Sequence, residues 1–113
     1  MPTPFEEMSA LDRLVHEPAR LAILTALSAC RACDFLYLQS LTALSRGNLS
    51  NHLQKLHEGG LVAIEKGFNG RMPRTMARLT NAGRDAIDRH WTQLDELRSR
   101  AHEWRAADLE NCD

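Results

Sequence analysis

The sequence lacks a long apolar run and a secretion signal. No stretch approaches the roughly 20 apolar residues that a membrane-spanning helix requires. The first ten residues, MPTPFEEMSA, contain neither a basic segment nor the apolar core of a signal peptide. We therefore expect a cytoplasmic protein with no membrane contact.

Cysteine, glycine and proline are also scarce. The three thiols, Cys30, Cys33 and Cys112, cannot all pair within one chain, and cytosolic thiols are normally reduced, which argues against a disulfide-stabilised scaffold. With 43% hydrophobic residues and only 6 Gly and 4 Pro, the composition is typical of a globular protein and not of a disordered one. At 113 residues we expect one domain, 1–113, around one core.

Residue patterns that carry catalysis are missing as well. No Ser/His/acid set, paired carboxylates or glycine-rich phosphate loop stands out in the sequence. We therefore predict that the chain is not an enzyme and uses no cofactor.

Charge is nearly balanced overall, at -1, but it is segregated along the chain. Residues 45–84 contain seven Lys and Arg against two Glu, whereas residues 1–44 and 85–113 are both net acidic. Exposed charges act over about 8 to 10 Å in physiological salt, so a concentrated basic segment can attract a polyanion even in a neutral protein. A nucleic-acid contact is therefore to be sought in the middle of the chain.

Two helices are expected near the N-terminus. The first begins at Ser9 and the second at Pro18, because proline in the first helical position costs no hydrogen bond. The apolar residues that form their buried faces are Leu11, Leu14, Val15, Leu21, Leu24 and Leu27.

A helix-turn-helix is predicted at about 35–58. Asp34 is suited to cap a short helix that ends near Thr42, or to lie in a short extended piece. Ser45 can cap the second helix, whose apolar stripe repeats at i, i+4 and i+7 before two glycines end it. The stripe is Leu49, Leu53 and Leu56, and the glycines are Gly59 and Gly60.

The periodicity then changes from 3.6 to 2. Two alternating stretches, LVAIEK and RTMARL, flank a segment with two glycines and a proline, which predicts a β-hairpin at about 61–79 with a basic tip. Thr80 can cap a last helix at about 80–107, roughly 38 Å long at about 1.5 Å per residue. Such a helix is too long for so small a domain to bury.

This order of elements resembles the winged-helix transcriptional regulators, and more narrowly the small bacterial regulators related to the MarR and ArsR families. The most specific pattern is LSxHLxxLxxxGLV from Leu49 to Val62, followed by LTxxGR from Leu79 to Arg84. The segments that carry the resemblance are 17–27, 44–66 and 73–84.

The resemblance implies an α+β fold that is mainly α. It implies a winged helix-turn-helix with a two-stranded wing and a long C-terminal dimerisation helix. It also implies that helix 46–58 enters a major groove of double-stranded DNA, while the wing tip touches an adjacent minor groove or the backbone.

Helix 46–58 has an unusual polar face. With its leucines turned inward, helical geometry places six polar residues on the far face or its margins: Arg46, Asn48, Ser50, Asn51, Gln54 and Lys55. Asn and Gln can pair with adenine and Arg with guanine, while Lys and Ser suit phosphates. Any solvated helix face is polar, but Gly47 and its Asn and Ser neighbours are poor helix formers that mere solvation gives no reason to cluster.

The wing offers three further candidate DNA contacts, namely Lys66, Arg71 and Arg74. Arginine in a narrow minor groove is a common recognition device. A basic hairpin can also be only a solvated surface, and this alternative stays open.

Apolar residues outside the predicted DNA-contacting elements suggest a homodimer interface. They are Leu11, Leu14, Ile87, Trp91, Leu94, Leu97 and Trp104. Exposed stripes of this kind are more often core or oligomer interface than ligand pocket. A symmetric dimer would place two recognition helices about 34 to 36 Å apart on a pseudo-palindrome. We expect a repressor that occupies its operator; the sequence identifies no small-molecule effector.

Cys30 and Cys33 leave alternatives open. ArsR-family proteins bind metal through a Cys-x-Cys-Asp run, but here the spacing is Cys-x-x-Cys, and two thiols fall short of about four zinc ligands. We predict no metal site, and keep metal- or thiol-responsive regulation as an alternative. A second alternative is a winged helix whose polar helix docks a protein partner instead of DNA.

Overall fold

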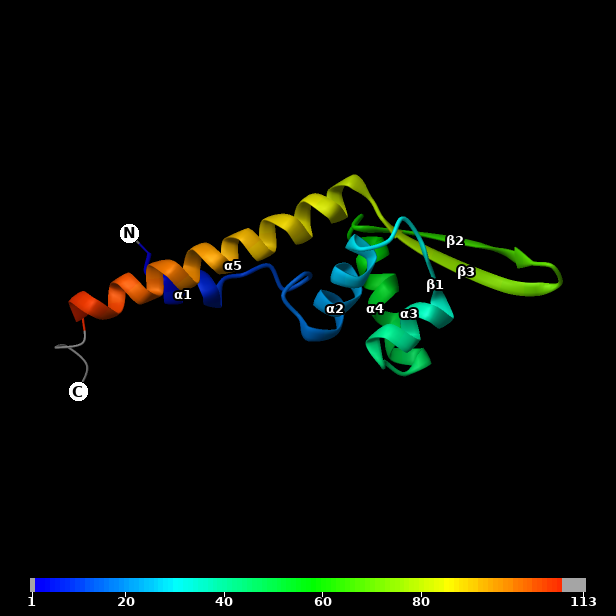
Figure 1. Cartoon of the computed structure of the whole chain (residues 1–113), viewed down its shortest axis with the longest axis horizontal. Coiled ribbons are helices and arrows are strands. Elements are labelled where there is room, and N and C mark those ends of the chain that lie inside the picture. The colour runs from blue at the N-terminus through cyan, green and yellow to red at the C-terminus, as the bar shows by residue number, and fades with distance from the viewer. Residues whose placement is uncertain (1, 109–113) are drawn as a thin grey trace.

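The computed structural model describes residues 2–108, with side chains described through Trp104. Cys112, considered above as a third thiol, lies outside the described range. The elements are α1 Pro4–Ser9, α2 Pro18–Ser28, β1 Cys33–Asp34, α3 Phe35–Thr42, α4 Arg46–Glu58, β2 Val62–Asn69, β3 Met72–Leu79 and α5 Asn81–Asp108. Figure 1 shows the β2–β3 hairpin and α5 projecting in opposite directions from a cluster of α2, α3 and α4. The molecule is elongated, 67 × 26 × 21 Å.

The N-terminal helix differs from the prediction. We expected a helix that begins at Ser9, whereas α1 ends there. A capping box explains the position: the Thr3 hydroxyl accepts from the Glu6 amide at 3.1 Å, and the Glu6 carboxylate accepts from the Thr3 amide at 3.2 Å. Residues 10–17 are irregular, yet Leu11 and Val15 in this segment are buried.

The helix-turn-helix is formed by α3 and α4, with the predicted caps. The Asp34 carboxylate accepts from the Leu36 amide at 2.8 Å, and the Ser45 hydroxyl accepts from the Asn48 amide at 3.2 Å. Gly60 ends α4 in the left-handed conformation, with φ of 78°. This turn lets the Leu61 amide donate to the Leu56 carbonyl at 3.0 Å, as in a Schellman motif.

The three strands form an antiparallel sheet in the order β1–β3–β2. The hairpin register runs from Val62 opposite Leu79 to Asn69 opposite Met72. Because side chains alternate along a strand, one face of the hairpin buries Val62, Ala77 and Leu79, and its outer half projects into solvent. The short extended piece allowed for Asp34 is β1, which pairs with β3.

The core lies where α2, α3, α4, the base of the sheet and the first turns of α5 meet. Its fully buried side chains include Ile23, Leu24, Leu27, Leu38, Leu49, Leu56 and Ile87. Leu41 on α3 is half exposed, because the helix is short and lies at the edge of this cluster. The fold is the mainly helical winged helix that the sequence predicts, with a hairpin wing and a long C-terminal helix.

The start of α5 is fixed tightly to the end of α4. Thr80 donates its hydroxyl to the Gly60 carbonyl at 2.7 Å and its amide to the Leu61 carbonyl at 3.0 Å, and its hydroxyl accepts from the Gly83 amide at 3.0 Å. A side chain at Gly83 would collide with the Leu61 carbonyl. These contacts set the direction in which α5 leaves the domain.

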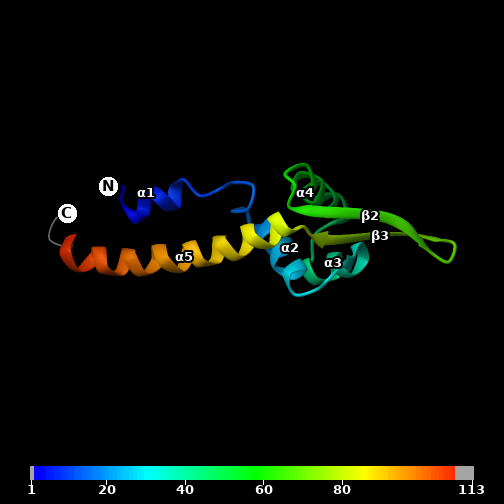
Figure 2. The same ribbon diagram turned by 90° about the horizontal axis from the view of Figure 1, so that it is seen from above.

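The far half of α5 packs against α1, as Figure 2 shows. Leu97 is buried there, and the Arg100 guanidinium lies 2.6 Å from the Glu7 carboxylate. Within residues 2–108 no helix combines the length and the apolar character needed to cross a membrane.

Candidate nucleic-acid interface

The outward face of α4 presents all six predicted recognition residues to solvent. Leu49, Leu53 and Leu56 are buried beneath it. The exposed residues are Arg46, Asn48, Ser50, Asn51, Gln54 and Lys55. Because the buried stripe fixes the rotation of the helix, these side chains are held on one accessible surface.

An ionic network anchors α4 to the start of α2. The Arg20 Nη1 atom lies 3.1 Å from His52 Nδ1, and its Nε donates to the Leu14 carbonyl at 2.7 Å. Burial opposes ionisation of Glu17, but hydrogen bonds from the Arg20 and Ala19 amides outweigh it and lower the pKa of this carboxyl group. Arg20 therefore links the start of α2 to α4 through its contact with His52.

His57 connects the C-terminal end of α4 to the wing. Its Nδ1 lies 3.1 Å from the Val62 carbonyl oxygen. A carbonyl oxygen can only accept, so Nδ1 donates. This bond joins the end of the recognition helix to the first residue of the wing.

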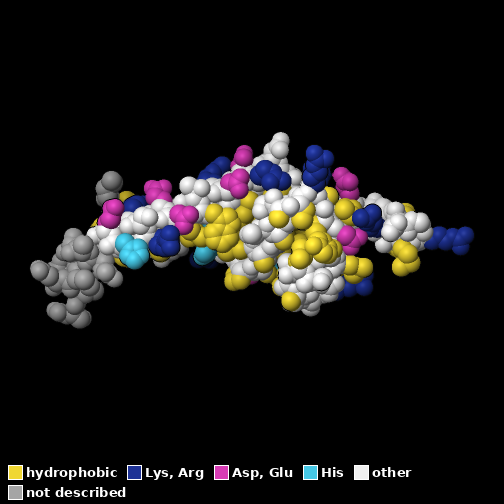
Figure 3. Space-filling model, in the orientation of Figure 1, with side chains coloured by type: hydrophobic (Ala, Val, Ile, Leu, Met, Phe, Trp, Pro, Cys, Tyr) yellow, Lys and Arg dark blue, Asp and Glu magenta, His cyan; other side chains and the backbone are white. Residues whose placement is uncertain are grey.

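The three predicted wing residues occupy different environments. Arg74 donates to the Asp34 carboxylate at 3.2 Å and is therefore tied to the base of α3. Arg71 is exposed in the hairpin turn, and Lys66 lies between the tip and α4. Among the side chains of residues 2–104, neither Arg71 nor Lys66 has a carboxylate within 4.0 Å. Figure 3 shows Lys and Arg at the end of the hairpin.

Two apolar side chains at the wing tip were missed by the sequence analysis. Phe68 and Met72 are 74% and 71% exposed. Their position near the turn of the predicted hairpin could have indicated this exposure, because a hairpin tip that projects beyond the core is not covered by other elements. The tip is therefore amphipathic, which suits contact with both the sugars and the phosphates of a backbone.

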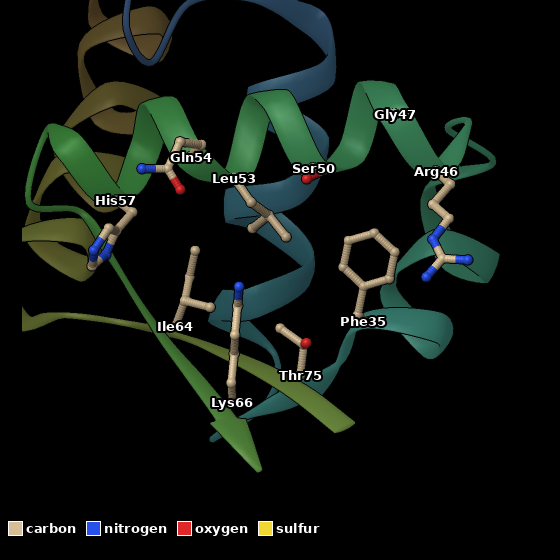
Figure 4. Close-up of a pocket in the computed structure, with 10 residues that line it drawn as sticks. All are labelled: Phe35, Arg46, Gly47, Ser50, Leu53, Gln54, His57, Ile64, Lys66 and Thr75. Carbon is tan, nitrogen blue, oxygen red and sulfur yellow. The ribbon is translucent and has the colours of Figure 1, made fainter. Parts of the chain in front are cut away.

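A cleft of about 820 Å³ separates α4 from the sheet and α3, and it was also missed. Figure 4 shows Leu53 pointing into it from α4, and Ile64 and Lys66 rising toward it from β2. The complete lining is Phe35, Arg46, Gly47, Ser50, Leu53, Gln54, His57, Ile64, Lys66 and Thr75. The lining comes from four elements and includes residues as far apart in the sequence as Phe35 and Thr75, so no local pattern could reveal the cleft.

The residues assigned to a dimer interface divide into two groups. Leu11, Ile87 and Leu97 are buried within the chain, and Leu14 and Leu94 are half-buried, so little of these side chains is available to a second copy. Trp91 and Trp104 are 45% and 41% exposed. A helical stripe does not distinguish contacts within a chain from contacts between chains, and the packing of α1 on α5 covers much of it.

The two cysteines near α3 are close together. Cys33 is buried in β1, and the half-buried Cys30 donates to the Ala26 carbonyl at 3.3 Å. Burial raises the pKa of the Cys33 thiol to about 11, and Cys30 adds to the effect. A thiol of this pKa is a weak nucleophile at neutral pH. Across the described residues, no three His, Cys, Asp or Glu side chains gather as a metal site.

Comparisons with known proteins agree with this geometry. The model of the family described as winged helix DNA-binding domain matches residues 19–98. An uncharacterized protein of Methanocaldococcus jannaschii, MJ0432, is 32% identical over 85 residues, which are 75% of this chain and 92% of that protein.

Two solved structures share the fold and 28% sequence identity. A transcriptional regulator homologue from Pyrococcus horikoshii OT3 has a TM-score of 0.77, covering 85% of this chain and 94% of its own. A MarR-family regulator from Silicibacter pomeroyi has a TM-score of 0.62, covering 96% and 73%. The motifs suggested MarR-type regulators, and the Silicibacter pomeroyi structure is one of that family. The chain belongs to the winged helix DNA-binding domain family.

Proposed function

We propose that the protein is a sequence-specific transcriptional repressor that binds a pseudo-palindromic operator as a homodimer in the cytoplasm. The observation that carries this proposal is the face of α4, where six polar side chains are exposed above a fully buried leucine stripe. Such a face can enter a major groove without unfolding the helix that supports it.

The proposal divides the work among the exposed residues. Asn51 and Gln54 read base edges, because a carboxamide can donate to and accept from adenine at once. Gln54 already donates to the Glu58 carboxylate at 3.3 Å, and this contact orients its amide before DNA arrives. Lys55 and Ser50 contact phosphates, which position the helix without reading sequence.

The wing extends the contact along the DNA. With α4 in a major groove, the hairpin reaches toward the neighbouring minor groove, where Arg71 at the tip meets a strong negative potential. Arg74 contributes less, because its guanidinium is paired with Asp34.

A second copy covers the aromatic side chains left exposed on α5 and α1. Trp91 is exposed midway along α5, while Phe5 and Trp104 make an edge-to-face contact with ring centres 6.4 Å apart and remain 49% and 41% exposed. Large exposed aromatic side chains are enriched at protein interfaces. Two copies joined there would direct both recognition helices to one side of a DNA duplex.

The test is fluorescence anisotropy with DNA from the region flanking the gene and with random DNA, at several salt concentrations. Asn51→Ala and Gln54→Ala are expected to cost about 1 to 3 kcal/mol on the operator and little on random DNA. Lys55→Ala is the matched control, which should weaken both DNAs alike and reduce the salt slope by about one. Equal losses on both DNAs for Asn51→Ala and Gln54→Ala would contradict base reading.

A protein-docking role is a second candidate, favoured by α3. Leu36, Tyr37 and Leu41 on this helix are 69%, 57% and 51% exposed. Figure 3 shows hydrophobic side chains over this region of the surface. A folded dimer with no operator complex at moderate salt would favour this role over DNA binding.

A further inference from the structure

The outer half of the β2–β3 hairpin carries apolar side chains that no other part of the described chain covers. Phe68 is 74% exposed and Met72 is 71% exposed, and the neighbouring Pro73 is exposed as well. The register places all three at the end of the hairpin, where Gly70, with φ of 65°, begins the turn. Apolar residues grouped on a projecting arm contribute little to the core, and exposed apolar patches mark contact surfaces.

Phe68 lies on the side of the hairpin that faces α4. Side chains alternate along a strand, so Ile64, Lys66 and Phe68 of β2 share one face. In Figure 4, Ile64 and Lys66 point toward α4. Met72 is opposite Asn69 in the register and therefore lies on the other face. Of the two most exposed apolar side chains at the tip, Phe68 is thus the one that continues the surface of α4.

Positive charge flanks Phe68 on this surface. Lys66 precedes it on the same face, and Arg71 is exposed in the turn beyond it. Among the side chains described up to residue 104, neither cation has a carboxylate within 4.0 Å. An aromatic ring between two uncompensated cations complements a groove with stacked bases inside and phosphates along both edges. This charge favours double-stranded DNA over an apolar protein surface as the occupant.

The reach of the hairpin fits this occupant when α4 lies in a major groove, so the inference rests on the proposed function. Phe68 lies four residues beyond Ile64 in β2, or about 13 Å at about 3.3 Å per residue. The centre of the adjacent minor groove is half of a helical turn of about 34 to 36 Å away, or roughly 17 Å. The aromatic side chain spans much of the difference, so the ring reaches the minor groove.

We propose that Phe68 is an apolar wedge that enters the minor groove, partly unstacks one base-pair step and bends the DNA. Apolar side chains inserted in this way kink the duplex by about 20 to 90° toward the major groove. The cost of unstacking depends on the sequence and is lowest at flexible pyrimidine–purine steps, TA and CA/TG. The protein therefore selects such a step about five base pairs from the centre of the α4 contact, without a hydrogen bond to it.

Bending is measured by fluorescence resonance energy transfer between dyes at the two ends of a DNA fragment from the region flanking the gene. The wild-type protein is expected to bend this operator fragment by at least about 20°, and Phe68→Ala to lose most of the bend. Phe68→Leu keeps an apolar wedge and should retain much of it. Met72→Ala is the matched control, because Met72 is almost as exposed but lies on the other face of the hairpin.

The unstacked step is located with 2-aminopurine, an adenine analogue whose fluorescence rises when it loses its stacking neighbours. Placed at successive adenine positions, it should brighten at one step in each half-site with the wild type and at none with Phe68→Ala. Replacing that step by a stiffer AA step should weaken wild-type binding about tenfold, but binding of Phe68→Ala by less than about twofold. Thermal denaturation should give both proteins the same melting temperature, because an exposed side chain contributes little to the fold.

Three results would overturn the inference: an operator complex that is straight, a bend that Phe68→Ala retains, or a bend that Met72→Ala loses equally. A loss of affinity in Phe68→Ala with no change in the bend would show that the ring only rests on the sugars, which also contradicts a wedge. Failure of the proposed function is seen separately, as a wild-type protein that does not prefer the operator to random DNA, and the inference falls with it.

Discussion

The two projecting ends of the molecule expose opposite kinds of surface. At one end, α4 and the hairpin expose Lys, Arg, Asn and Gln above leucines that are fully buried. At the other, α5 and α1 expose tryptophan and phenylalanine among acidic residues. A surface with basic, amide-bearing side chains suits DNA, and one with partly covered aromatic side chains suits a second copy of the chain.

Each end contains an amphipathic helix, α4 at one and α5 at the other, so amphipathicity alone does not separate the two ends. The apolar stripe of α4 is buried in the core, although Leu53 also lines the cleft. The stripe of α5 is covered over Ile87 by the core and over Leu97 by α1, but not at its tryptophans. What remains exposed after folding distinguishes the proposed DNA-binding surface from the proposed self-association surface.

The largest effect is expected from breaking the support of the DNA end. Leu49 is fully buried, so Leu49→Ala should lower the free energy of unfolding by about 2 to 5 kcal/mol. Urea denaturation followed by circular dichroism measures this change. Leu36→Ala, on the exposed face of α3, is the control and should change stability by less than about 0.5 kcal/mol. A similar loss in both variants would contradict the burial difference.

The next effect concerns the aromatic end. Replacing both Trp91 and Trp104 by alanine should cost dimer formation about 2 kcal/mol or more, because aromatic side chains dominate many interfaces. Analytical ultracentrifugation measures the monomer–dimer equilibrium. Lys55→Ala should not change it, since Lys55 lies at the DNA end. A wild-type protein that is monomeric at all concentrations would exclude this interface.

The junction between the two ends should be sensitive to one methyl group. Gly83→Ala places a Cβ against the Leu61 carbonyl and should destabilise the fold by about 1 to 3 kcal/mol. Gly67→Ala in β2 is the matched control, because nothing lies within 4 Å of the added Cβ. Thermal denaturation compares the two variants. An unchanged melting temperature for Gly83→Ala would show that α5 can shift freely.

Smaller effects are expected within the wing. Arg71→Ala should reduce the salt slope of DNA binding by about one unit, because the guanidinium is unpaired and sits at the tip. Arg74→Ala should reduce it less, because Asp34 already neutralises part of that charge. The slopes come from anisotropy titrations at several salt concentrations. A larger loss for Arg74→Ala would place the DNA nearer the base of the hairpin.

The smallest effect is a pH dependence at the aromatic end. Burial and the neighbouring His16, whose Nδ1 lies 3.1 Å from Nε2 of His90, lower the pKa of His90 below 6.5, while Asp12 opposes this. The unfolded chain then binds more protons than the folded chain, so stability present above pH 6.5 decreases as the pH falls below it. Urea denaturation between about pH 7.5 and 5.5 should show a smaller decrease for His90→Gln. An equal decrease would assign the effect to other groups.

Much of the fold could be predicted because its signals are local. Ser45, Asp34 and Thr80 cap the helices that follow them, and Leu49, Leu53 and Leu56 form the buried stripe. The helix expected at Ser9 was wrong because the capping box at Thr3 starts and completes a short helix upstream. Leu11, Leu14 and Val15 lie in an irregular segment that packs on the core. Their spacing resembles that of the buried face of a helix, which explains the wrong prediction.

The sequence by itself determined where α2 to α5 and the two strands of the wing lie, and which face of α4 is polar, because caps and periodicity act within one or two turns of the chain. Only the tertiary structure decided which of those polar groups remain available. It pairs Arg74 with Asp34 and Arg20 with His52, leaves Lys66 unpaired, and forms the cleft beside α4. It also buries Leu97 while leaving Trp91 exposed. These outcomes depend on contacts between residues that are far apart in the chain. The free energy of such contacts is set by packing and by the distances between charges, which only the folded structure defines.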